Sequence, residues 1–175
     1  RGLGDVYKRQ GKDTGERFYD AVKAAADVDG IKRVRLGSLE PDHLTDEVLC
    51  NLSKIDKLCP QFHISLQSGS DSTLKAMNRH YTADEYYELS VKLRNTFKNC
   101  TLTTDIMVGF PTETEKDFEE TVAFAEKVGF EKIHIFPYSV RTGTRAALMK
   151  PQIEKHVKEE RAAALAVTAE KIRSA

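Results

Sequence analysis

Polar and glycine-containing segments follow each of four short apolar runs, and they carry the side chains best suited to chemistry. They cover residues 37–41, 67–71, 109–113 and 137–144. Asp105 stands inside the third apolar run, where an ionised acid is costly unless it is hydrogen-bonded or lies near a strand's exit. In parallel α/β folds, binding and catalytic groups gather in the loops after the strands. The spacing therefore predicts one working site built from these segments.

Each segment also has a structural explanation that competes with a role in binding. Residues 67–70 could form the turn that caps a helix. Gly109 and Pro111 could only shape a turn, and Arg79 could be an ordinary surface arginine. Taken singly, each of these explanations is the more economical one. The prediction of a site depends on the four segments meeting at one edge.

Two histidines and one charge run are interpreted as structural. His63 and His134 lie in strand patterns and are typical of core or interface histidines rather than metal ligands. The run 154–161 (Glu-Lys-His-Val-Lys-Glu-Glu-Arg) is typical of a solvated helix face with ion pairs four residues apart.

Alternating periodicities predict both helices and parallel strands. Helices are expected near 15–28, 46–55, 83–98 and 115–128, with a long final helix that has Pro151 at its first position. Strands are expected at 31–36, 62–66, 102–108 and 132–136. Strands separated by helices are joined by right-handed crossovers, which gives an open doubly wound sheet or part of a (β/α) barrel. Four strands cannot close a barrel, and the chain opens on a helix, so we expect at least one more strand upstream.

Composition limits the function classes. The 175 residues carry 27 basic and 27 acidic side chains, which argues against an overall electrostatic grip on nucleic acid but permits a local basic rim. No apolar run approaches the length of a membrane span and no signal peptide is visible, so the cytoplasm is the expected location and no membrane partner is expected. The three cysteines, Cys50, Cys59 and Cys100, match no metal motif and fit a reducing compartment.

The segments together resemble the radical S-adenosylmethionine (SAM) methylthiotransferases. Residues 106–113 (Ile-Met-Val-Gly-Phe-Pro-Thr-Glu) are similar to the adenine-contacting strand of radical SAM enzymes. Residues 66–81 resemble the family's fourth barrel strand and helix, and residues 136–147 resemble its sixth-strand loop. The resemblance implies an α/β fold, an incomplete (β/α) barrel of the radical SAM type with about four parallel strands and flanking helices.

One branch of the family fits best. Residues 33–41 resemble the enzymes that methylthiolate threonylcarbamoyladenosine beside the tRNA anticodon. The isopentenyladenosine branch and the branch that acts on a ribosomal protein tend to carry His-Pro where this chain has Glu40 and Pro41. The implied partners are the tRNA anticodon stem-loop and an electron donor. The implied cofactors are SAM and two 4Fe–4S clusters, one of which would reduce SAM to a 5′-deoxyadenosyl radical.

The resemblance also implies roles for individual residues towards SAM. Gln67 and Asp105 would bind its ribose and neighbouring polar groups. Arg79 would pair with its carboxylate, which a bidentate guanidinium suits. Ser38 or Glu40, at the exit of the first strand, would bind its amino group.

The remaining implied contacts lie at the third and fourth strands. Met107 and Gly109 would let the adenine lie against the backbone of the third strand, while Tyr138 and Arg141 would face the substrate. No catalytic residue and no metal ligand is implied within this chain. The family's Cys-x-x-x-Cys-x-x-Cys motif does not occur here, and cluster ligation requires thiolates.

These departures define the expected domain organisation. Residues 11–175 would be the C-terminal part of a radical SAM core, without its cluster-binding strand or the flanking domains, and inactive alone. Residues 1–10 do not fit the family and are interpreted as an artefact or a disordered segment. Half a barrel would expose an apolar strand edge, which predicts poor solubility.

Other classes remain open at this point. They are another radical SAM methylthiotransferase, a SAM- or RNA-binding module without catalysis, and an aldolase-type barrel. The last would need a Schiff-base lysine inside a strand. Residues 62–66 and 102–108 contain none, and Lys132 opens its strand at the wrong end.

Overall fold

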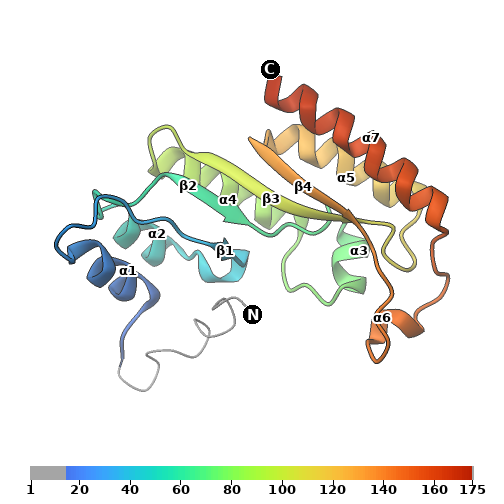
Figure 1. Cartoon of the computed structure of the whole chain (residues 1–175), viewed down its shortest axis with the longest axis horizontal. Helices are drawn as coiled ribbons and strands as arrows, with labels where there is room; N and C mark the ends of the chain where they lie inside the picture. The colour runs from blue at the N-terminus through green and yellow to red at the C-terminus, as the bar shows by residue number, and fades with distance from the viewer. Residues whose placement is uncertain (1–14, 175) are drawn as a thin grey trace.

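A four-stranded parallel sheet forms the centre of the computed structural model, which describes residues 15–174 (Figure 1). The strands follow chain order across the sheet, and every neighbouring pair is parallel. They are β1 (Ser38–Leu39), β2 (Gln61–Ile64), β3 (Thr101–Val108) and β4 (Lys132–Pro137). The predicted α/β class with about four parallel strands and flanking helices is confirmed.

The helices connect the strands and cover one side of the sheet. Figure 1 looks onto the other side, with α4 and α5 behind the strands and α7 beside β4. None of the helices within residues 15–174 has the length and apolar character needed to cross a membrane. The helices are α1 (Phe18–Asp27), the 3₁₀ turn η2 (Pro41–His43), α2 (Asp46–Leu52), α3 (Asp71–Ala76), α4 (Ala83–Thr96), α5 (Glu115–Val128), α6 (Arg145–Leu148) and α7 (Lys155–Ser174).

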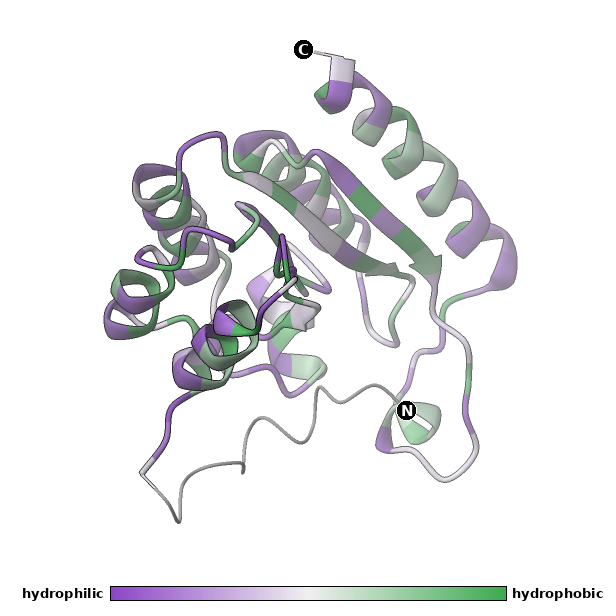
Figure 2. Ribbon diagram, turned by 60° about the vertical axis from the view of Figure 1, so that its left-hand side comes forward, coloured by the Kyte–Doolittle hydropathy of each residue, from purple (hydrophilic) through white to green (hydrophobic). Residues whose placement is uncertain are grey.

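The two faces of the sheet differ in chemistry because successive side chains of a strand point to opposite sides. Phe62, Leu102 and Ile106 are almost fully buried in the core. Most of the alternate positions on β2 and β3 are polar, and His63 and Asp105 among them are partly exposed. Figure 2 shows the corresponding alternation of hydrophobic and hydrophilic residues along strands and helices. Parallel sheets are normally apolar on both faces, so a polar uncovered face is a place for function.

Helix termini agree with the sequence where a capping side chain is present. Thr45, Thr82 and Thr114 each accept a hydrogen bond from a backbone N–H in the first turn of the helix they precede. Gly129 ends α5 with φ +68°, the left-handed conformation that glycine adopts at low cost. The predicted helix 115–128 is therefore confirmed with its bounds.

Two expectations for the secondary structure are wrong. Residues 31–36 form no strand, and only Val34 makes an isolated bridge, to Leu58. Leu58 precedes β2, which starts at Gln61, so the ladder between β1 and β2 begins only at Ser38. The final helix begins at Lys155 rather than Pro151. The Pro151 carbonyl accepts a hydrogen bond from the Thr112 N–H at 3.0 Å, which holds this residue in a loop against the exit of β3.

Candidate functional site at the strand exits

The segments that follow the four strands meet at one edge of the sheet through their backbones. The Gln67 N–H donates to the Asp105 carbonyl at 2.8 Å, and the Met107 N–H donates to the Gln67 carbonyl at 2.9 Å. The Tyr138 N–H donates to the Val108 carbonyl at 2.9 Å. The chain leaving β2 therefore lies directly beside β3, and the chain leaving β4 lies on its other side.

Gln67 has a backbone conformation that few side chains adopt. Its φ is +70°, and the residue is buried. A non-glycine residue in this left-handed region costs free energy, and such residues cluster at binding and catalytic sites. The observation fits a working role for this turn better than a cap alone, because the capping position of α3 falls on Ser70, not on Gln67.

An ion pair joins the exit of β1 to the loop after α3. Arg79 Nη1 lies 2.9 Å from Glu40 Oε2, and the two side chains are 28% and 35% exposed. The contact occupies one guanidinium nitrogen and leaves other N–H groups for a ligand. Arg79 is thus neither isolated nor purely a surface residue, and it presents a cation beside an anion at the edge where β1 ends.

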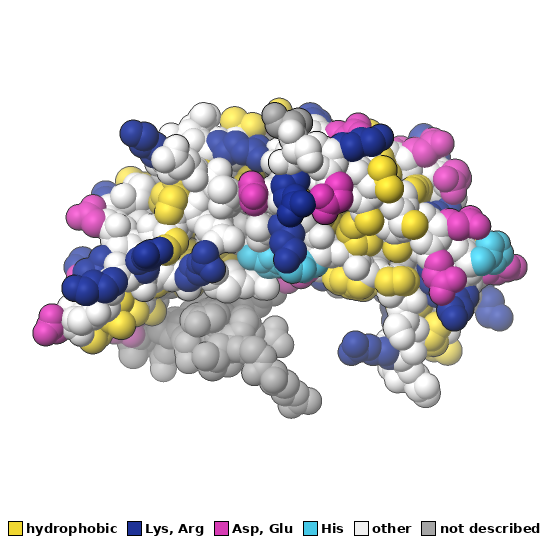
Figure 3. Space-filling model, turned by 45° about the horizontal axis from the view of Figure 1, so that its top comes forward, with side chains coloured by type: hydrophobic (Ala, Val, Ile, Leu, Met, Phe, Trp, Pro, Cys, Tyr) yellow, Lys and Arg dark blue, Asp and Glu magenta, His cyan; other side chains and the backbone are white. Residues whose placement is uncertain are grey.

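On the uncovered face, the Asp105 carboxylate lies within ion-pair distance of His63. His63 Nε2 lies 3.2 Å from Asp105 Oδ2, and His63 Nδ1 lies 2.9 Å from Thr103 Oγ1. The rings of His63 and His134 are 5.7 Å apart, and histidine side chains are visible near the centre of Figure 3. Neither histidine is a core residue, because both rings belong to the polar face, where His134 is exposed and His63 is partly so; an interface role for them stays a prediction.

Ser38 and Met107 accompany these residues on the same face. Ser38 is exposed and in register with His63 on β2. Met107 is partly buried and in register with Phe136 on β4. Met107 therefore offers an apolar surface close to the exit of β3, two positions beyond Asp105.

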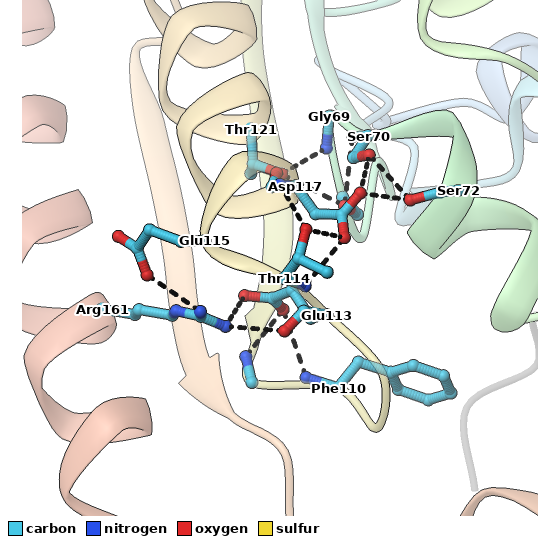
Figure 4. A network of polar contacts seen from close by, with 12 residues as sticks. Gly69, Ser70, Ser72, Phe110, Glu113, Thr114, Glu115, Asp117, Thr121 and Arg161 are labelled. Atoms are coloured by element: carbon cyan, nitrogen blue, oxygen red, sulfur yellow. Dashed lines mark hydrogen bonds and ion pairs between the residues drawn. The ribbon is translucent and has the colours of Figure 1, made fainter. Parts of the chain in front are cut away.

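The loop after β3 is organised by a buried carboxylate. Glu113 Oε2 accepts the Gly109 N–H at 2.8 Å and the Phe110 N–H at 3.2 Å (Figure 4). Arg161 of α7 lies 2.8 Å from Glu113 Oε1, and the two side chains are 7% and 4% exposed. Burial raises the pKa of Glu113, while Arg161 and the two backbone N–H groups oppose that shift.

The sequence does not reveal Arg161 as part of the site, because its charge run predicts a solvated helix face. Arg161 is instead buried, and with Leu165 and Thr168 it forms the inward stripe of α7. These positions are four and seven residues apart, the spacing of one helix face. That spacing was the available signal, but an arginine at its start is rarely buried unless it is paired.

A second network joins the loop after β2 to the start of α5. Asp117 accepts hydrogen bonds from the hydroxyls of Ser70 (2.7 Å), Ser72 and Thr114 (2.6 Å). Thr121 Oγ1 accepts the Gly69 N–H at 3.1 Å. Partial burial raises the pKa of Asp117, but the hydrogen bonds outweigh it and lower that pKa to about 2. The loops after β2 and β3 are thereby fixed to the same helix (Figure 4).

The exit of β4 carries a buried hydroxyl without a partner. Tyr138 packs edge-on against Phe110, with ring centroids 5.4 Å apart. Its hydroxyl meets no hydrogen-bond partner within the part of the chain that the structure describes, and such an atom calls for a ligand or a water molecule. Arg141 does not join this group; its side chain is exposed in the loop before α6.

The cysteines lie away from this edge. Cys59 and Cys100 precede β2 and β3, at the entry end of the strands, and Cys50 is exposed on α2. Burial raises the pKa of the Cys100 thiol to about 11, so this group is protonated at neutral pH. Across residues 15–174 no three His, Cys, Asp or Glu side chains come together as metal ligands.

Comparison with known proteins identifies the superfamily of this chain. Residues 11–125 match the model of the Radical SAM superfamily. The chain belongs to this superfamily. Membership implies SAM and a 4Fe–4S cluster as cofactors. The exit edge fits SAM, with the Glu40–Arg79 ion pair and a Tyr138 hydroxyl that has no partner among the residues the structure describes. The described residues do not fit the cluster, because cluster ligation requires thiolates that converge.

The chain is also similar in sequence to individual characterised proteins. The chain is 42% identical over 161 residues to the tRNA-2-methylthio-N(6)-dimethylallyladenosine synthase of Clostridium botulinum. That match covers 91% of this chain and 36% of the relative, so the chain spans little more than a third of the relative's length.

Two solved structures share the fold. Coproporphyrinogen III oxidase from Escherichia coli, a radical SAM enzyme, matches with a TM-score of 0.63 at 15% identity, over 81% of this chain and 32% of that one. Elp3 from the archaeon Methanocaldococcus infernus matches with a TM-score of 0.60 at 16% identity, over 95% of this chain and 38% of that one. At these identities the likeness concerns the fold alone.

Proposed function

We propose that this chain is part of the radical SAM core of an enzyme that methylthiolates threonylcarbamoyladenosine next to the anticodon of tRNA. Superfamily membership and the methylthio-tRNA synthase relative support the reaction class. The choice of base is supported by Glu40 and Pro41, where other branches of the family tend to carry His-Pro. The single observation that carries the site is the convergence of the four strand exits on one edge.

SAM would lie along this edge with its amino-acid end at β1. The Glu40–Arg79 pair is complementary to a zwitterion, because the carboxylate suits an ammonium group and the guanidinium suits a carboxylate. Ser38 offers a further hydroxyl to the ammonium end from within β1. The pair stays about one-third exposed, so these charges can exchange partners at small cost.

The nucleoside end of SAM would lie between β2 and β3. Gln67 and Asp105 offer acceptors and donors for ribose hydroxyls, and His63 Nε2 lies 3.2 Å from one of the two Asp105 oxygens. Met107 and the main chain of Gly109 would contact the adenine, while the Lys158 side chain fills the space where a Gly109 Cβ would stand. Gly109 is required there because its φ is +69°.

The substrate would approach from β4. Tyr138 supplies a buried hydroxyl that has no hydrogen-bond partner among residues 15–174, and Arg141 is an exposed cation three positions further along the same loop. The tRNA anticodon stem-loop, an electron donor and a cytoplasmic location belong to this proposal, together with a second cluster for delivery of the methylthio group. The cluster ligands would come from residues other than the three cysteines of this chain.

A second candidate has its own support. The Clostridium botulinum relative is named for N(6)-dimethylallyladenosine, which is the isopentenyladenosine branch. The two candidates share SAM and the radical step and differ only in the base modified. A binding module without catalysis is the alternative of a different class.

Nucleoside analysis of tRNA distinguishes the two candidate substrates from each other and from a binding module without catalysis. The gene that encodes this chain would be deleted, and total tRNA digested and measured by mass spectrometry. We expect methylthio-threonylcarbamoyladenosine to disappear while its unmethylthiolated parent accumulates. Loss of the methylthio-dimethylallyl nucleoside instead would establish the second candidate. Unchanged levels of both would contradict an enzyme of tRNA methylthiolation.

A further inference from the structure

Arg161 and Glu113 form a buried ion pair between α7 and the loop after β3. Arg161 Nη1 lies 2.8 Å from Glu113 Oε1 and 3.2 Å from the Glu113 carbonyl oxygen. Its Nη2 donates to Glu115 Oε2 at 3.0 Å. The guanidinium thus binds a side chain and a main-chain atom of Glu113 at once, which fixes the position as well as the charge of that residue.

Glu113 in turn restrains the loop that follows β3. Its second carboxylate oxygen accepts the N–H groups of Gly109 and Phe110, which follow β3 directly. Gly109 and Thr112 have φ angles of +69° and +74°, so two of the loop's positions are in the left-handed region. A loop of this kind keeps its shape only where its surroundings determine it.

α7 lies beyond the residues that match the superfamily model, although the alignment with the Clostridium botulinum relative covers 91% of the chain. The superfamily match ends at residue 125, whereas α7 covers Lys155–Ser174. The match therefore assigns no role to Arg161. Replacing a buried pair by apolar residues is often neutral for stability, whereas removing one partner leaves an uncompensated charge. A pair placed on the loop of a ligand site is better explained by the geometry it maintains.

We infer that Arg161 is a positioning residue: acting through Glu113, it holds the loop from Gly109 to Glu113 in the shape that receives the adenine of SAM. The inference rests on the proposed function in that it takes SAM as the ligand of this edge. Its mechanical part, the restraint of Gly109 and Phe110, concerns the chain alone and can be measured without SAM.

The test combines residue-resolved amide hydrogen exchange with the affinity of the chain for S-adenosylhomocysteine. Arg161→Met should increase exchange at Gly109 and Phe110 by roughly 10- to 100-fold, the value of a charged hydrogen bond, and weaken binding by about 10-fold or more. Arg161→Lys retains the positive charge but lacks the planar guanidinium with its paired N–H donors, so it should recover part of the exchange protection and part of the affinity. Arg94→Met is the matched control, since Arg94 also donates to a carbonyl, that of Gly129, but on an exposed part of α4.

A double-mutant cycle shows whether Arg161 acts through Glu113. The double variant Glu113→Gln with Arg161→Met should exchange and bind no worse than the more impaired single variant, because the two residues form one restraint. Additive effects, or wild-type exchange at Gly109 in the Arg161→Met chain, overturn the inference. Faster exchange with unchanged affinity overturns the role towards SAM. If the wild-type chain fails to bind S-adenosylhomocysteine while exchange responds as expected, the SAM site of the proposed function fails and the restraint stands.

Discussion

The charges of Glu40 and Arg79 remain partly in water, at 35% and 28% side-chain exposure. Exposed pairs of this kind contribute at most about 1 kcal/mol to stability. Their value lies in what they present to a ligand, because a zwitterion can bridge both groups. This makes Arg79 a residue whose substitution separates binding from folding.

Substitution of Arg79 should affect binding far more than stability. We expect Arg79→Met to lower affinity for S-adenosylhomocysteine about 10-fold or more, since a charge-assisted hydrogen bond is lost, and to change the free energy of unfolding by less than about 1 kcal/mol. Lys92→Met, which breaks an exposed pair with Asp46, is the control. Isothermal titration and urea unfolding measure the two quantities; equal affinity of wild type and Arg79→Met would rule out this role.

Asp117 links acid stability to the loops after β2 and β3. Its folded pKa of about 2 lies below the ordinary value, so its contribution is complete above about pH 4 and is lost as the pH falls towards 2. Asp117→Asn should cost roughly 1–2 kcal/mol at pH 7. The difference from wild type should shrink between about pH 4 and 2, as measured by urea unfolding. A difference that persists unchanged at the acid end would refute the assignment.

Single residues of the site could be predicted where a motif or an unusual position marked them. Asp105 was marked by an acid inside an apolar run, and Gly109 by a glycine at a strand end. The partners of these residues could not be predicted, because His63 and Arg161 are 42 and 48 positions away from Asp105 and Glu113. Such pairing depends on crossover geometry that local patterns do not contain. The roles in SAM binding stay predictions.

Elements were predictable where periodicity and caps agreed. α4 and α5 begin after threonine caps that also form capping boxes, and the predicted bounds differ from the structure by at most two residues. β1 was misplaced because two residues of pairing leave almost no alternation to detect. The start of α7 was misplaced because Pro151 suits a first helical position locally, while its carbonyl is engaged by Thr112.

The contact between α7 and β3 makes a further prediction at this scale. A Cβ added to Gly109 would lie 2.3 Å from Lys158 Cγ, in addition to the unfavourable φ of +69°. Gly109→Ala should therefore cost more than the roughly 1–2 kcal/mol of the backbone alone, and Lys158→Ala should relieve the steric part. Gly143, with φ +84° and no atom within 4 Å of an added Cβ, reports the backbone cost alone. Equal unfolding free energies for Gly109→Ala and Gly143→Ala would contradict this account.

The whole molecule presents a sheet with one apolar covered face and one polar uncovered face. The order of helices and strands was enough to predict the parallel sheet, because crossover connections allow few alternatives. The polar face was not foreseen as such, since alternation in β2 and β3 is mixed with threonines that are buried. On this face Ser38 and His134 are exposed and His63 is partly exposed.

The distribution of cysteines predicts how the chain behaves with iron. Cys59 and Cys100 lie at strand entries and Cys50 on α2, away from the exit edge, so we expect reconstitution with iron and sulfide to give no stable 4Fe–4S absorption. No 5′-deoxyadenosine should form when SAM and a reductant are added. Cluster absorption together with SAM cleavage by this chain would refute the prediction.

The central claim, that SAM binds where the four strands end, is tested most directly by an amide chemical-shift map of the chain titrated with S-adenosylhomocysteine. We predict saturable shifts concentrated at Glu40, Gln67, Met107 and Gly109. Shifts confined to other surfaces, such as the hollow lined by Tyr19, Lys23 and Lys57 between α1 and α2, or no shifts at saturating ligand, would contradict it.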